Sequence, residues 1–386
     1  MFDSKNVNLE VLRKRAYNLR WATVPSDVIP LTAADPDFPC ASEIVDAIAE
    51  YCKSGYFSYS PAEGIYEFKE SLHNFFLNKR SFNVAPDQIL PVDSAAFGIH
   101  LVCKTILRPG DEAIIFDPVD FLFQFSIEDV GAIPVRYSIP PGKDLVDFNE
   151  LESIISKKTK LICLCNPLNP TGKVFKTEEL ITLAHIAKKY NLIILSDEIW
   201  SDIVFSPHIY RSIASLSDEI SQSVITVTGF SKSYGLAGLR IGAVATANTA
   251  LFRKLLDFSL HHFTIHGANS IAQIAGIAAL NKSQYWLNGF LSHLTNMRNL
   301  LSNRINSIKG LSTIAPEGCY VCFVNIKDTG MTSEAFRQKL LKEAKVAVVP
   351  GLSRWFGPGA EGFIRISFAT SEEILDEALN RIENIL

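Results

Sequence analysis

Residues 160–197 read KLICLCNPLNPTGKVFKTEELITLAHIAKKYNLIILSD, and this stretch carries the pattern that decides the fold. The runs at 160–165 and 192–196 are apolar without alternation, which is typical of parallel strands covered on both faces. Residues 177–190 lie between them with helical spacing of apolar side chains, Thr177 as the expected N-cap and two glutamates in the first turn. Strand, helix and strand in this order predict an α/β protein with a doubly wound, mostly parallel sheet.

The pattern continues toward the C-terminus and then changes. VITV (224–227) and IGAVA (241–245) predict two more buried strands. In the last third we expect a long amphipathic helix over 283–308, a strand over 319–326, a helix over 332–344, a strand over 363–369 and a closing helix from Ser371. We therefore predict a large domain over 40–288 and a small α+β domain built from 1–39 and 289–386.

Composition excludes several classes of function. The 386 residues carry a net charge of −4 with scattered Lys and Arg, which argues against nucleic acid or an anionic membrane as the main partner. No apolar run approaches the roughly 20 residues that cross a bilayer. The seven cysteines are odd in number and have no framework spacing, so we expect a reducing, cytoplasmic location.

Polar segments follow three of the predicted strands. Asn166–Gly172 follows the first, Ser196–Glu198 closes the second, and Gly229–Lys232 follows the third. In open α/β sheets ligands bind outside the carboxyl ends of the strands, so Asn169, Asp197 and Lys232 are expected to converge on one crevice. An amine that forms an imine, an anion for a ring cation and an amide for a phenolate together suit pyridoxal 5′-phosphate (PLP).

The motifs NPLNPTG, SDEIW and GFSKSYGLAGLRIG, in this order, resemble the fold-type-I PLP enzymes, the class I/II aminotransferases. The resemblance extends from IPLTAADPDF, which begins at Ile29, to the C-terminal GFIRISFA. It implies a PLP-dependent transferase fold of type I. It also implies that Lys232 is the Schiff-base lysine and moves the Cα proton, that Asp197 keeps the pyridine nitrogen protonated, and that Asn169 donates to the ring oxygen and contacts substrate.

The same resemblance implies the remaining contacts. Arg240 would bind the phosphate, Arg365 would clamp the substrate α-carboxylate with its planar fork, and Ala34 would line the substrate site. Tyr59, in GYFSYSPAEG, matches a tyrosine that reaches the neighbouring subunit's phosphate. A homodimer with shared active sites is therefore expected.

Several positions depart from the family pattern. Trp200 stands where a tyrosine usually donates to the ring oxygen, and Gly229 removes one phosphate hydroxyl while Ser231 remains. The phosphate loop reads VDSAAFG (92–98), in which the N–H groups of Ala95 and Ala96 begin a helix with Ser94 or Asp93 nearby. In DPVDFLF (117–123), Asp120 occupies the position of the ring-stacking aromatic residue. We expect either that Phe121 takes over the stacking or that the alignment there is shifted by one residue.

Our first hypothesis for function is an aminotransferase that moves an amino group between a small amino acid and a 2-oxo acid. The alternative is a C–S β-lyase of the cystathionine β-lyase type, which RWATVPSDVIPLTAADPDF and SDEIWSDIVF resemble. A non-catalytic regulator would need a DNA-binding appendage or the loss of Lys232, and neither is seen in these 386 residues. Amino-acid specificity stays open, because no second substrate-facing arginine can be placed.

Two further clusters are interpreted as structural. His261, His262 and His266 have no cysteine or acidic residue placed to complete a zinc site, so no metal is predicted. Cys319 and Cys322 have redox-motif spacing, but in a strand they would point to opposite faces, which favours buried thiols.

Overall fold

The fold is described from a computed structural model, which describes residues 1–142 and 145–386. Its centre is a seven-stranded sheet in the order β2-β8-β7-β6-β5-β3-β4. The strands are β2 (Ile89–Val92), β3 (Glu112–Asp117), β4 (Ile133–Ser138), β5 (Thr159–Cys165), β6 (Ile193–Asp197), β7 (Val224–Gly229) and β8 (Gly242–Ala245). Strands β7, β6, β5, β3 and β4 are parallel neighbours, whereas β8 runs antiparallel to both β7 and β2. The predicted mostly parallel α/β sheet is therefore confirmed.

Helices cover this sheet, and its inner strands are buried along almost their whole length. The helices of this part of the chain are α2 (Ser42–Lys53), α3 (Tyr66–Arg80), α4 (Ala95–Ile106), α5 (Leu122–Asp129), α6 (Thr177–Lys189), α7 (Asp218–Ser221), α8 (Thr249–Ser259) and α9 (Ser270–Lys282). Helix α4 packs on β6, β7 and β8, and it also contacts α5 and α8. Thr177 was the expected N-cap of α6, but it is the first helical residue. The helix begins there because the Glu179 side chain accepts the Lys176 N–H at 2.6 Å.

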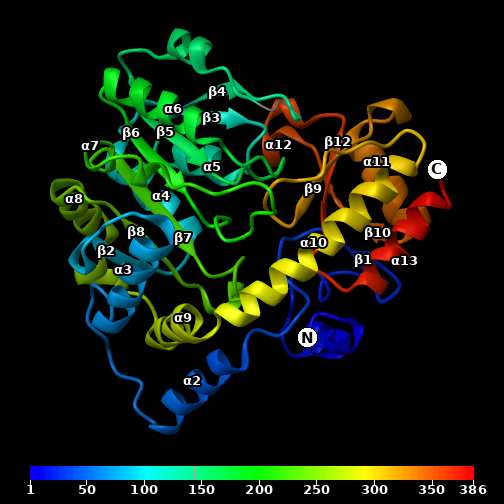
Figure 1. Ribbon diagram of the computed structural model, residues 1–386, viewed down its shortest axis with the longest axis horizontal. Coiled ribbons are helices and arrows are strands. Elements are labelled where there is room, and N and C mark those ends of the chain that lie inside the picture. The colour runs from blue at the N-terminus through cyan, green and yellow to red at the C-terminus, as the bar shows by residue number, and fades with distance from the viewer. Residues whose placement is uncertain (143–144) are drawn as a thin grey trace.

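A smaller unit contains the antiparallel sheet β11-β12-β9, with strands β9 (Val321–Asn325), β11 (Val349–Pro350) and β12 (Phe363–Ser367). Its helices are α10 (Gln284–Ser307), α11 (Ser333–Lys339), α12 (Ser353–Phe356) and α13 (Glu372–Glu383). In Figure 1 the long helix α10 runs from beside α9 toward β9 and β12. The helix expected over 332–344 is shorter than predicted, because residues 340–344 form a π-helical turn after α11.

Both ends of the chain meet in this smaller unit. Helix α1 (Leu9–Lys14) lies near the start of the chain, and β1 (Ile29–Pro30) pairs in parallel with β10 (Val346–Ala347). Buried residues of both units belong to one main hydrophobic cluster, so the two units share a core. The domain boundaries at 40 and 288 stay a prediction. Within the described ranges, no helix has the length and apolar character needed to cross a membrane.

Candidate active site

A cavity of about 290 Å³ lies at the carboxyl ends of β5, β6 and β7. Its wall includes Cys165 and Asp197, which are the last residues of β5 and β6, and Lys232, which follows β7. The predicted site residues that line it are Ala34, Ser94, Ala95, Ala96, Asn169, Asp197, Trp200, Ser231, Lys232, Arg240 and Arg365. Residues that lie more than 300 positions apart in the sequence thus meet at one edge of the sheet, where a doubly wound fold places its ligands.

Lys232 is held at the floor of this cavity by the N-terminal segment. Its Nζ donates a hydrogen bond to the Ala34 carbonyl at 2.6 Å and lies 5.2 Å from the centre of the Trp200 ring. Burial lowers the pKa of Lys232, and the positive charge of Arg365 acts in the same direction, while Asp35 opposes both. A lysine whose pKa is lowered loses its proton more readily, and the neutral amine is the form that attacks a carbonyl.

Asp197 is a buried carboxylate without a cationic side chain bound to it among the described residues. Its Oδ1 accepts the Ile199 N–H at 3.1 Å. Burial raises the pKa of Asp197 to about 7, with Asp120 and Glu198 adding to the increase. A carboxylate in this state is stabilised in its charged form by any cation that enters the cavity beside it.

The opposite end of the cavity is built to hold an anion. Ser94 is the N-cap of α4, where its Oγ accepts the Phe97 N–H at 3.1 Å, and Arg240 Nη2 donates to the same Oγ at 3.0 Å. The first helical residues, Ala95 and Ala96, face the cavity beneath this arginine. Unpaired N–H groups, the positive end of a helix dipole and a guanidinium together fit a phosphate group.

Arg365 enters the cavity from β12 and is oriented by two oxygen acceptors. Its Nη1 donates to Asn169 Oδ1 at 3.1 Å, and its Nη2 donates to the Thr32 carbonyl at 3.2 Å. Its Nε is buried and has no hydrogen-bond partner among the residues described. An unpaired donor on a buried guanidinium is costly, so this edge is suited to a carboxylate ligand.

The comparisons with known proteins agree with this geometry. The family profile "Aminotransferase class I and II" matches residues 26–382. The chain belongs to this family. A putative aminotransferase of Bacillus subtilis is 34% identical over 95% of this chain and 93% of its own length, and an aspartate aminotransferase of Pyrococcus horikoshii is 33% identical over 95% and 92%. The crystal structure of an aromatic aminotransferase from the latter organism superimposes with a TM-score of 0.88 at 30% identity, covering 95% of this chain and 97% of that one. The predicted fold type and the predicted enzyme class, a PLP-dependent aminotransferase, are confirmed.

The aminotransferase does not place Phe121 where stacking was expected. Phe121 is absent from the cavity wall, is 37% exposed and packs edge-on against Trp355 with ring centres 5.4 Å apart. Asp120 turns inward instead, because its Oδ1 accepts the Leu122 N–H at 3.3 Å at the start of α5. Leu122 and Phe123 line the cavity and supply its apolar wall.

Trp200 does line the cavity of the aminotransferase, and it is also packed. The indole is 2% exposed and meets the Tyr320 ring edge-on, with ring centres 4.7 Å apart. The predicted hydrogen bond from its N–H to the cofactor stays a prediction.

Tyr59 lies outside the cavity. Its side chain is 88% exposed, and its ring centre is 5.2 Å from that of His266. The predicted contact of Tyr59 with a neighbouring subunit also stays a prediction.

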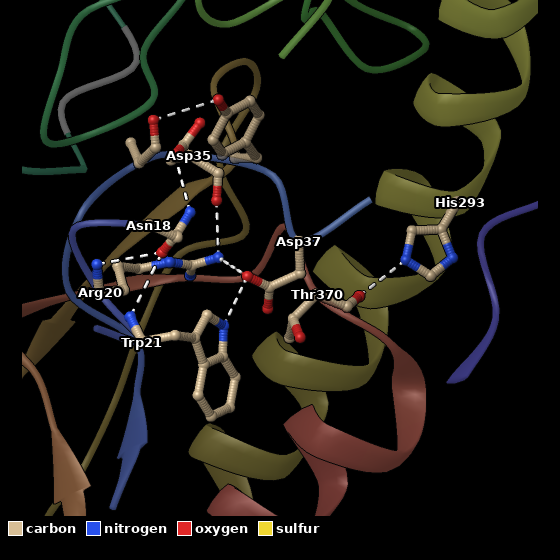
Figure 2. Close-up of polar contacts among 9 residues, drawn as sticks. Asn18, Arg20, Trp21, Asp35, Asp37, His293 and Thr370 are labelled. Carbon is tan, nitrogen blue, oxygen red and sulfur yellow. Dashed lines mark hydrogen bonds and ion pairs between the residues drawn. The ribbon is translucent and has the colours of Figure 1, made fainter. Parts of the chain in front are cut away.

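Sequence reasoning missed the acidic N-terminal segment that follows the cavity-lining Ala33 and Ala34. Figure 2 shows Arg20 reaching Asp37 and the backbone of Asp35, with Asn18 and Trp21 beside it. Asn18 Nδ2 holds the Asp35 carboxylate at 2.9 Å, and that carboxylate opposes the lowered pKa of Lys232. The segment ADPDF carried the resemblance, but no local signal marks its first acid as a neighbour of a lysine almost 200 residues away.

Cys319 and Cys322 are buried, although Cys319 precedes β9 instead of lying in it.

Proposed function

We propose that Lys232 binds the PLP carbonyl and that this cavity transfers an amino group between a small amino acid and a 2-oxo acid. The observation that carries the proposal is the meeting, in one cavity, of a buried lysine, a buried aspartate at a strand end, a helix N-terminus with an arginine, and a guanidinium with an unpaired donor. These four groups match the amine, cation partner, phosphate site and carboxylate clamp that amino transfer requires.

Each residue has a defined task in this scheme. Arg240, Ser94, Ser231 and the N–H groups of Ala95 and Ala96 hold the phosphate. PLP, when bound, supplies an electron-withdrawing ring that acidifies the substrate Cα–H bond.

The reacting end of the cavity has its own set of tasks. Asp197 keeps a proton on the ring nitrogen, while Asn169 and Trp200 donate hydrogen bonds to the ring oxygen. Arg365 orients the substrate by its α-carboxylate. Once the substrate amine has displaced it from the cofactor carbonyl, Lys232 Nζ would be free to move the proton of the substrate Cα.

We further propose a cytoplasmic homodimer in which Tyr59 reaches the partner's phosphate site. The exposure of Tyr59 supports a role outside its own subunit. Seven free cysteines, most of them buried, support a reducing compartment.

A panel of amino donors and 2-oxo acids tests the proposal. We expect holoenzyme to exchange amino groups between the two and to release little ammonia. Lys232→Ala should lose this activity and the visible absorption of the bound cofactor while keeping its far-UV circular dichroism. Release of pyruvate and ammonia without exchange would instead assign β-elimination. A fully active Lys232→Ala variant would remove the lysine from the mechanism.

A further inference from the structure

Asp120 is a charged group of the cavity for which the proposed mechanism has no task. Its Oδ1 accepts the N–H of Leu122, the first residue of α5, whereas its Oδ2 accepts the Asn169 side-chain N–H at 2.9 Å and lies 3.9 Å from Arg365 Nη1. The side chain is 23% exposed, and it lines the cavity. Both oxygens therefore have a partner in the protein, but the carboxylate still lines the cavity and presents its charge to whatever enters.

The ionic groups that this chain brings to the cavity can be assigned one by one. Arg240 belongs to the phosphate end, Lys232 to the cofactor carbonyl, Asp197 to the ring nitrogen and Arg365 to the substrate α-carboxylate. Asp120 remains, and its charge is negative. Within the described residues of the same subunit, no further lysine, arginine or histidine lines this cavity.

We propose, building on the function proposed above, that Asp120 is a specificity-determining residue that selects amino acids whose side chain carries no negative charge. A substrate α-carboxylate bound to Arg365 would share that guanidinium with Asp120, whose Oδ2 lies 3.9 Å from Arg365 Nη1. A second substrate carboxylate adds another negative charge, and no other cation of the same subunit lines the cavity to meet it. In a cavity of low dielectric constant, like charges repel more strongly than in water. An amide of the same shape avoids this repulsion and can donate a hydrogen bond to the carboxylate.

The charge preference should depend on pH. Four titratable groups of the cavity interact electrostatically with Asp120. They are Arg365 from β12, Lys232 after β7, Asp197 at the end of β6 and the Cys165 thiol at the end of β5. Burial raises the pKa of Asp120, while Arg365 and Lys232 oppose the increase. Discrimination against a second carboxylate therefore grows with rising pH as Asp120 loses its proton. An Asp120→Asn variant keeps the other titratable groups. It should therefore lose only the part of the pH dependence that is due to Asp120.

Succinate and succinamate provide a matched pair of unreactive probes, because they differ only in one terminal carboxylate or amide. We expect calorimetric titration of the holoenzyme at neutral pH to show succinamate binding at least tenfold more tightly than succinate. Asp120→Asn should reduce this ratio at least fivefold and remove its increase with pH. Both probes are compared within each variant, so any common loss from the altered contact with Asn169 cancels. Steady-state kcat/KM values for L-asparagine and L-aspartate should show the same change.

Two further variants serve as a charge control and as a replacement for Asp120→Asn. Asp129→Asn removes the same charge from the far end of α5, where the carboxylate faces His100 outside the cavity, and it should leave the ratio within twofold of the wild type. Asp120→Ser retains an oxygen that can cap α5, and it replaces Asp120→Asn if the latter does not fold. Equal affinity for the two probes in the wild type, an unchanged ratio in both Asp120 variants, or an equal drop in Asp129→Asn would overturn the inference.

Failure of the inference can be told apart from failure of the proposed function. If amino transfer proceeds but succinate binds as tightly as succinamate, only the role of Asp120 is wrong. If neither probe binds and no donor transfers its amino group, the carboxylate clamp and the proposed function are wrong, and the inference falls with them.

Discussion

At the scale of the residue, the chemistry of this cavity depends on how strongly burial raises the pKa of Asp197. The carboxylate ends a buried strand, and among the described residues the one hydrogen bond to its side chain comes from the Ile199 backbone. Burial disfavours the charged form, which raises the pKa of Asp197 from 3.8 to about 7. The same burial strengthens the attraction of the Asp197 carboxylate to a cation. Its buried charge is costly without a partner, and for that reason it is an effective partner for a protonated ring nitrogen.

This property predicts a pH-dependent stability of the cofactor-free protein. Because the pKa of Asp197 is higher in the folded chain than in the unfolded chain, its contribution to stability is present below about pH 4 and is lost as the pH rises to about 7. The loss is at most on the order of 4 kcal/mol, at 1.36 kcal/mol per unit. Thermal unfolding of the wild type and of Asp197→Asn should show the wild type losing stability relative to the variant over this range. A difference that stays constant with pH would contradict the assignment.

At the scale of the element, the anion site depends on the close approach of α4 to β8. A Cβ atom on Gly242 would lie 2.8 Å from the Ala95 nitrogen and 2.9 Å from the Ser94 carbonyl carbon, so only glycine lets the helix begin there. We expect Gly242→Ala to displace the N-terminus of α4 and to raise the dissociation constant of PLP about tenfold or more. The matched control is Gly238→Ala in the same segment, where an added Cβ meets nothing within 4 Å. Equal PLP affinity in both variants, measured by equilibrium dialysis, would contradict this role for Gly242.

The N-terminal segment forms the floor of the site and is fixed by a buried ion pair. Arg20 Nη2 lies 2.5 Å from Asp37 Oδ1, and the two side chains are 0% and 1% exposed. Trp21 Nε1 donates to the same Oδ1 at 2.7 Å. The segment between them carries Ala34, whose carbonyl accepts the Lys232 hydrogen bond. The pair therefore connects the stability of the loop to the position of the lysine.

Arg20→Met should be strongly destabilising, because it leaves Asp37 as a buried charge without its cation. We expect a loss of about 3–5 kcal/mol, seen as a lower urea midpoint. Lys53→Met breaks an exposed pair with Glu50 and should cost about 0.5 kcal/mol or less. If the two variants lose stability equally, the Arg20–Asp37 pair does not hold the loop.

At the scale of the whole molecule, one site draws on both ends of the chain. Thr32 and Ala34 come from the N-terminal segment, Arg365 comes from β12, and the remaining groups follow strands of the large sheet. Aromatic side chains on the surface of the same molecule, including Tyr56, Phe57, Tyr59 and Phe263, are strongly exposed. Exposed aromatic side chains of this kind are consistent with the homodimer proposed above.

Complementation tests whether two subunits share sites. A Tyr59→Ala variant and a Lys232→Ala variant should each be inactive, and after subunit exchange their mixture should regain roughly a quarter of the wild-type activity. In a heterodimer one site carries both substitutions and the other carries neither, while half of randomly paired dimers are heterodimers. Exchange is verified by native mass spectrometry. No recovery in exchanged dimers would place the function of Tyr59 within its own subunit.

Local sequence patterns predicted four of the seven strands of the large sheet, namely β5, β6, β7 and β8, and most of the cavity wall. The apolar runs of β5, β6 and β7 and the polar residues after them are short-range features, and parallel strands necessarily bring their carboxyl ends to one edge. Tertiary structure decided that Asp120 faces the cavity while Phe121 packs outside it, because Asn169 donates to the Asp120 carboxylate and Trp355 packs against the Phe121 ring. It also decided the pairing of Arg365 with Asn169, which are 196 residues apart, and of Lys232 with Ala34, which are 198 residues apart. Such contacts depend on how packed elements meet in space, and no periodicity along the chain encodes them.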